Sequence, residues 1–192
     1  MSGIINRARS KSGHIGPSAG LEFIEEKIWV TADSDNLKII DCFSDEFKSY
    51  FLQIYVTPST NTHDIKLRWV RDSNTIDESS SYQYLFHGWD WDGASYTFSG
   101  KNATLSYIVP NCHNSTSWGC QASLWVHGAR DNARNMYTHG EVTWLHGSDK
   151  MVGGHWSQAW NGADSQLWEG LIVFCSSTLR AGSYITVYGV RT

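Results

Sequence analysis

After about residue 20, hydrophobic and polar residues alternate over short runs. In the run Ile65–Arg71, the residues Ile65, Leu67 and Trp69 fall on one face, with Lys and Arg between them. This is the period of a half-buried β-strand. Comparable runs are Lys27–Thr31, Leu37–Phe43, Tyr50–Val56, Ser81–His87, Ser95–Phe98, Ala103–Val109, Gln121–His127, Tyr137–Leu145 and Met151–Trp160.

The end of the chain has the densest pattern of β-forming residues. Leu171–Phe174 and Tyr184–Val190 are rich in aliphatic, β-branched and aromatic residues, and Thr178–Gly182 separates them. This arrangement predicts a closing hairpin. Because chain ends usually fray unless they are paired, we expect the last strand to lie inside its sheet.

These patterns together predict about ten to twelve strands with turns between them. Only Phe43–Lys48 suggests a helical turn, and no segment is long enough to be the crossover helix of a parallel sheet. We therefore predict an all-β protein, an antiparallel β-sandwich or jelly roll with an extended N-terminal arm. The arm is expected at residues 1–20 and the sandwich domain at residues 21–192.

The charge is unevenly placed along the chain. Residues 1–20 carry three basic residues and no acid, whereas residues 21–192 carry 12 basic and 19 acidic residues, a net charge of −7. An acidic domain argues against a nucleic-acid partner. No apolar run approaches the ~20 residues of a membrane span, so we expect no membrane partner either.

The first 20 residues alternate small residues with isoleucine and basic side chains. Composition alone leaves three interpretations open: a flexible tail, an amphipathic transit peptide, and an arm that becomes ordered against a partner. If the segment is an arm that becomes ordered against a partner, its isoleucines would make apolar contacts with that partner and its basic residues would make charge contacts. These candidate partner-binding residues are Ile4, Ile5, Arg7, Arg9, Lys11 and Ile15.

The cysteines leave one alternative open. Cys112 and Cys120 could close a small loop as a disulfide, but no signal peptide precedes them. Cys42 and Cys175 lie in strand-like runs, where buried thiols are common. We favour four reduced, structural cysteines over a disulfide.

The most conspicuous local string is His87–Gly93. Trp89 and Trp91 would share a face on an extended segment and could stack on sugar rings. The interpretation that we favour is a loop whose tryptophans cover the end of the sandwich while its acids face water. The Asp-x-Asp-Gly sequence of this string supplies only two carboxylates, too few for a complete calcium loop.

No catalytic or metal constellation stands out. The histidines of the last third are not paired at His-x-His or His-x-x-x-His spacing, although strands can bring distant ligands together. Hydrolysis of a glycosidic bond would need two carboxyl groups roughly 5–10 Å apart, and the sequence places no pair at that distance. We predict no enzyme, no cofactor and no bound metal. The residues considered were His127, His139, His146 and His155, and the carboxylates Glu141, Asp164 and Glu169.

Both ends of the chain resemble a known family. Ser2–Gly16 resembles the Ser-Gly-x-Ile…Ser-Lys-Ser-Gly-x-Ile-Gly leader of small virion proteins of tailed bacteriophages. Ala181–Val190 resembles their closing strand, and Tyr50–Ser59 followed by Ile65–Trp69 is similar to their first core hairpin. The Trp- and His-rich stretch Tyr84–Trp160 departs from the family pattern.

The resemblance implies a non-enzymatic virion protein, located on the particle and often trimeric, that is anchored through its N-terminal arm. Two roles compete. A capsid decoration or cement protein would use the arm to bridge capsid or other virion proteins, and the absence of a shaft or repeat favours this role. A tail fibre or tail-tip protein would instead recognise host surface glycan. A third hypothesis is a carbohydrate-binding or glycoside-cleaving sandwich outside any virion.

Overall fold

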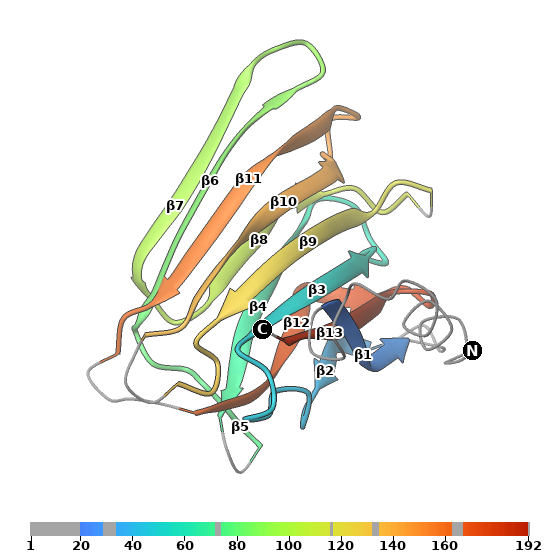
Figure 1. Cartoon of the computed structure of the whole chain (residues 1–192). Coiled ribbons are helices and arrows are strands. Elements are labelled where there is room, and N and C mark those ends of the chain that lie inside the picture. Colours follow the sequence, from blue (N-terminus) through green and yellow to red (C-terminus); the bar gives the residue numbers. More distant parts are fainter. Residues whose placement is uncertain are drawn as a thin grey trace.

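The structure is a computed structural model that describes residues 20–28, 34–71, 74–115, 117–131, 135–162 and 167–191. All regular elements in this part of the chain are β-strands (Figure 1). It contains no helix that could cross a membrane. The strands are β1 (Gly20–Ile28), β2 (Ser34–Ile39), β3 (Ser49–Val56), β4 (His63–Arg71), β5 (Thr75–Ile76), β6 (Tyr82–Asp90), β7 (Ser95–Ala103), β8 (Ser106–Cys112), β9 (Cys120–His127), β10 (Tyr137–Leu145), β11 (Met151–Trp160), β12 (Trp168–Leu179) and β13 (Tyr184–Arg191).

The strands form two antiparallel sheets, as predicted from the alternating pattern. Sheet A has eight strands in the order β1-β13-β3-β9-β10-β11-β6-β7. Sheet B has the order β2-β12-β4-β5, and β8 also pairs with β4. Figure 1 shows sheet B behind one side of sheet A, with the tip of the β6–β7 hairpin reaching beyond it. The result is a two-layer β-sandwich.

Three details of the prediction were wrong. β12 belongs to sheet B and β13 to sheet A, so the chain crosses between the layers where a closing hairpin was expected. The same holds for β3 and β4, which also lie in different sheets. At Asp45 and Glu46 there is a turn and no helix. The last strand is nevertheless internal, because β13 pairs with β1 on one side and β3 on the other.

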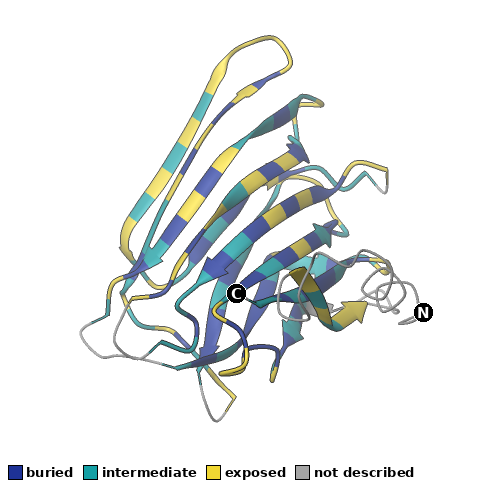
Figure 2. Cartoon of the chain, viewed as in Figure 1, coloured by how far each residue is buried: buried dark blue, intermediate teal, exposed yellow. Residues whose placement is uncertain are grey.

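Buried and exposed residues alternate along the strands of sheet A (Figure 2). In β10, Thr138, Val142 and Trp144 are buried, whereas His139 and Glu141 between them are exposed. One face of this sheet therefore packs on sheet B and the other faces solvent, as is typical of antiparallel sheets.

Large aromatic side chains fill the space between the layers. The ring of Trp144 lies 5.2 Å from that of Phe86, centroid to centroid, and Phe98 stacks on Phe86 at 4.9 Å. The indole N–H of Trp156 donates to the backbone oxygen of Tyr107 on β8, at 2.7 Å. Trp156 therefore links the two sheets by a hydrogen bond as well as by packing.

A buried carboxylate joins the other end of the sandwich. Asp77 is 1% exposed, and it accepts hydrogen bonds from the indole N–H of Trp160 at 3.0 Å and from the Ser79 hydroxyl at 3.0 Å. Arg71 forms an ion pair with the same carboxylate. A buried charge is tolerated only when it is paired and hydrogen-bonded, and the Asp77 carboxylate meets both conditions.

The two ends of the described chain meet at one edge of sheet A. Gly20, the first residue of β1, lies opposite Arg191 of β13. The Arg191 guanidinium Nε lies 2.8 Å from a carboxylate oxygen of Glu22, and the same side chain pairs with Glu46. These ion pairs hold the last residues of β13 to β1 and to the turn before β3.

The four cysteines are buried and free, in line with the favoured prediction. Burial raises the pKa of the Cys112 thiol to about 12, and it also raises the pKa of the Cys42 and Cys120 thiols. Since the thiolate is the reactive form, we expect no thiol of the native protein to react with Ellman's reagent at pH 8 within minutes. Four equivalents should react in denaturant, and one rapid equivalent under native conditions would contradict this structure.

Replacement of Trp156 by Ala should lower the free energy of unfolding by about 3–5 kcal/mol, because it leaves a cavity between the sheets. The matched control is Trp91→Ala, since Trp91 is 69% exposed and its loss should change stability by less than about 0.5 kcal/mol. Urea unfolding of the two variants measures both values. Equal losses would show that Trp156 does not link the layers.

Candidate binding site

The solvent face of sheet A carries side chains in rows that cross its central strands. In one row Phe51 lies beside Trp125, Trp125 beside His139, His139 beside Ser157, and Ser157 beside Leu85. This row crosses β3, β9, β10, β11 and β6. Because strands are about 4.8 Å apart, it spans roughly 19 Å. We call it the aromatic row.

A second row runs parallel to the first and is polar. It comprises Gln53, Ser123, Glu141, His155 and His87, again each opposite the next on the neighbouring strand. All five side chains are exposed. We call it the polar row. Amide, hydroxyl, carboxylate and imidazole groups therefore stand beside the aromatic row, within reach of the same ligand.

The aromatic row continues over the adjacent strands. The ring of Trp125 lies 5.0 Å from that of Phe51, Phe51 lies 6.2 Å from Tyr188, and Tyr188 lies 6.0 Å from Phe23. These are spacings at which aromatic rings attract one another. Phe23 is exposed, and the other three rings are partly exposed. The rings of the aromatic row therefore support one another through these contacts, but they remain accessible to solvent.

Between the two rows the surface is hollowed into an open groove of about 580 Å³. Its walls come from β3, β6, β9, β10 and β11, and the residues of the two rows form most of its lining. Gly140 on β10 also lines the groove. A Cβ atom at this position would lie 2.0 Å from the backbone oxygen of Ser123, so the close approach of β9 and β10 requires glycine here.

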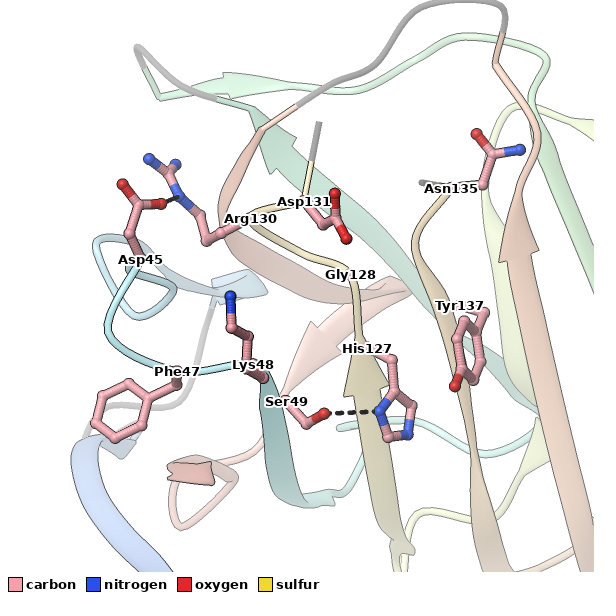
Figure 3. Close-up of a pocket in the computed structure, with 10 residues that line it drawn as sticks. All are labelled: Asp45, Phe47, Lys48, Ser49, His127, Gly128, Arg130, Asp131, Asn135 and Tyr137. Carbon is pink, nitrogen blue, oxygen red and sulfur yellow. Dashed lines mark hydrogen bonds and ion pairs between the residues drawn. The ribbon is translucent and has the colours of Figure 1, made fainter. Parts of the chain in front are cut away.

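A second cavity, of about 540 Å³, lies at the end of β9 and β10 (Figure 3). The residues that lead into β3, follow β9 and precede β10 form its walls. Arg130 on one side is held by Asp45, with the guanidinium Nε 3.1 Å from a carboxylate oxygen. Lys48 and Asn135 provide further polar groups. We call this cavity the end pocket.

The end pocket and the groove adjoin at a stack of three rings. The centroid of His127 lies 4.6 Å from that of Tyr137 and 5.3 Å from that of His139. Ser49 Oγ lies 2.8 Å from Nδ1 of His127 and fixes its ring orientation (Figure 3). Burial, and to a smaller extent the neighbouring His139, hold the pKa of His127 below its ordinary value.

The candidate carboxylates do not come together. Glu141 lies in the polar row of sheet A, whereas Glu169 lies on β12 of sheet B and accepts a hydrogen bond from the backbone N–H of Asn74. Asp164 lies outside the described residues. The described chain therefore presents no pair of these carboxylates for cleavage of a glycosidic bond.

The histidines of the last third divide into two groups. His127, His139 and His155 line the groove or the end pocket, but His146 lies beyond β10, where Nδ1 is 2.8 Å from the Ser148 hydroxyl. Among the described residues, no three side chains of His, Cys, Asp or Glu are placed to hold a metal ion.

Trp89 and Trp91 are exposed, by 51% and 69%, and so neither covers the end of the sandwich as the favoured interpretation expected. Trp89 belongs to β6, and its ring makes an edge contact with His87 at 4.8 Å. Trp91 lies in the turn that joins β6 to β7. The arm residues Ile4, Ile5, Arg7, Arg9, Lys11 and Ile15 lie outside the described residues.

The Asp-x-Asp-Gly turn holds a lysine. Lys150 Nζ lies 3.2 Å from a carboxylate oxygen of Asp90 and 2.8 Å from one of Asp92. The buried Asp90 carboxylate also accepts hydrogen bonds from the backbone N–H groups of Asp92 and Ala94. An ammonium group therefore lies between the two carboxylates that a calcium ion would use.

Trp125 and Phe51, with Tyr137 and Tyr188, were not singled out from the sequence. The signal was present, because Ser123, Trp125 and His127 alternate with buried residues, and Tyr137, His139 and Glu141 alternate with buried or partly buried ones. That alternation identifies the exposed face of one strand. It does not show which other strands lie beside it, and the groove exists only where five strands meet.

No protein-family model, no curated protein and no solved structure matches the chain. The site is therefore defined by the geometry of this chain.

The contribution of the Asp90 turn to the free energy of unfolding should decrease in acid. Desolvation raises the pKa of Asp90, but the Ala94 N–H and the Lys150 ammonium more than offset it, and the pKa lies below its ordinary value. A depressed folded-state pKa stabilises the fold above the unfolded-state pKa of ~3.9, and the stabilisation is lost as pH falls through the folded-state value. The difference in unfolding free energy between the unaltered protein and Asp90→Asn should therefore shrink below about pH 4. A difference that is the same from pH 7 to pH 2.5 would contradict this assignment.

Proposed function

We propose that this chain is a non-enzymatic virion protein of a tailed bacteriophage whose sandwich domain binds a saccharide on the solvent face of sheet A. The observation that carries the proposal is the pair of registered rows, one aromatic and one polar, on either side of an open groove.

Sugar rings have apolar C–H faces and hydroxyl groups at their edges, so they are bound by aromatic surfaces flanked by hydrogen-bonding groups. The exposed parts of Trp125 and Phe51 supply the aromatic surface. Ser123, Glu141 and His155 supply the hydrogen-bonding groups beside it. Ligand sites commonly combine aromatic lining with a few placed polar groups in this way. The groove is open along the sheet, so it suits a chain of sugars better than a small enclosed ligand.

Virion location is supported by the resemblance of Ser2–Gly16 and Ala181–Val190 to the leader and closing strand of small tailed-phage virion proteins. In this proposal the arm anchors the protein and the groove faces outward toward host glycan. Several copies on one particle, as in the trimer that the resemblance implies, would raise the avidity for a repetitive surface without a larger groove.

Capsid decoration remains a second candidate because of one specific observation. Residues 1–20 are basic without any acid, whereas residues 21–192 have a net charge of −7. A basic arm suits an acidic groove on a capsid subunit, and an acidic domain would keep neighbouring particles apart. Binding to undecorated phage heads, together with no binding to any glycan, would favour this role.

The test is glycan-array binding of the full chain, followed by calorimetry on the strongest hit. Trp125→Ala should weaken binding by about 30-fold, because loss of a central aromatic anchor commonly costs about 2 kcal/mol. Trp118→Ala is the matched control, since Trp118 is a solvent-exposed tryptophan that lies between β8 and β9, outside the groove. It should leave affinity unchanged. Equal affinity of the two variants would refute the groove as the binding site.

A further inference from the structure

The solvent face of the groove has a charge pattern unlike that of the whole domain. Of the outward positions on β9, β10, β11 and β6, only Glu141 is a carboxylate. The same positions hold four imidazoles, while the whole chain has 19 acidic residues and eight histidines. The four are His127, His139, His155 and His87. Acidic side chains are thus nearly absent from this face, and half of the histidines gather on it.

Building on the proposed saccharide site, we infer that the saccharide is an acidic one, whose carboxylate or phosphate groups are bound by the histidines of the groove. His155 is central to this arrangement, because it lies opposite His87 on one side and Glu141 on the other. Within the described residues, neither His155 nor His139 makes a side-chain hydrogen bond or ion pair, so their ring nitrogens remain available to a ligand.

The remaining charged groups around the groove do not cancel this pattern. The outward residues of β3 and the facing part of β7 are uncharged, including Gln53 and Thr97. In the end pocket, Lys48 and Arg130 stand against two acids, Asp45 and Asp131. On the five strands of the groove, Glu141 is therefore the one carboxylate that an anion lying along the polar row would meet. The next carboxylate in register, Glu26 on β1, lies two strands beyond Gln53 and accepts a hydrogen bond from the Thr186 hydroxyl.

Acid should strengthen the interaction. Imidazoles gain a proton as pH falls below neutrality. His155 and His87 lie directly opposite each other on β11 and β6, so one anionic group between the two strands can contact both rings. Because the pKa of His127 is lowered by burial, its contribution requires a lower pH than that of an ordinary imidazole.

The test compares neutral, carboxylated and phosphorylated oligosaccharides on one array at pH 5.5 and pH 7.5. The strongest acidic carboxylated binder is then measured by calorimetry beside its own methyl ester, which has the same rings without the charge. The acidic form should bind at least about ten-fold more tightly at pH 5.5 than at pH 7.5, and its ester should show little dependence on pH.

Substitutions of two exposed residues should have opposite effects on the binding of an acidic saccharide. Glu141→Gln removes the one opposing charge and should strengthen binding of the acidic form about five-fold at both pH values, since a unit charge a few ångströms away is worth about that much near a protein surface. His155→Gln should reduce the gain between pH 7.5 and pH 5.5. Both residues are exposed, and an unchanged melting temperature confirms that each variant is folded.

The outcomes separate the two levels of the proposal. If neutral glycans bind equally well at both pH values and Glu141→Gln has no effect, the inference that the saccharide is acidic is overturned, while the proposal of saccharide binding stands. No binding to any glycan would overturn both. Binding of inorganic polyphosphate that survives Trp125→Ala would show charge attraction without saccharide recognition and would also overturn the inference.

Discussion

The register between β10 and β11 is the constraint on which the rest of this structure depends. Trp144 and Trp156 point into the sandwich from these strands, and His139, Glu141 and His155 occupy the outward positions between and beside them. A shift of either strand by one residue would move its tryptophan into solvent and its outward polar groups into the core. The core residues therefore fix which side chains face the groove, even though their own side chains are buried inside the sandwich.

The same constraint makes the site rigid. Its residues come from five neighbouring strands, not from loops, and every strand is held on both sides by a neighbour in sheet A. Side chains on such a sheet lose little further freedom when a ligand binds, which lowers the cost of binding. The part of the aromatic row from Phe23 to Trp125 lowers this cost further, because each ring is already supported by the next.

The alternation of residues was sufficient to predict the strands and the sandwich, since burial on one face leaves a period of two in the sequence. It could not assign strands to layers. Leu171–Phe174 and Tyr184–Val190 have the composition of a hairpin, yet the link at Thr178–Gly182 carries the chain from one sheet to the other. Local composition is nearly the same for both connections, and only long-range packing decides between them.

The candidate site was harder to predict for the same reason. The string around Trp89 and Trp91 is conspicuous because its aromatic residues are close in sequence. The groove residues Phe51, Trp125 and His155 are separated by about 100 positions of chain and become neighbours only through strand pairing. A binding surface built across strands leaves a weak sequence signal on each strand and a strong one only on the assembled sheet.

The meeting of Gly20 and Arg191 at one edge of sheet A has a mechanical consequence. Any load applied to the domain through the residues before Gly20 enters the sheet at the end of the β1–β13 ladder. A load directed across the strands would break the hydrogen bonds of this ladder one after another, starting at Gly20. The ion pair between Arg191 and Glu22 lies at the end of the ladder where that separation would begin, whereas the pair between Arg191 and Glu46 keeps β13 attached to the turn before β3.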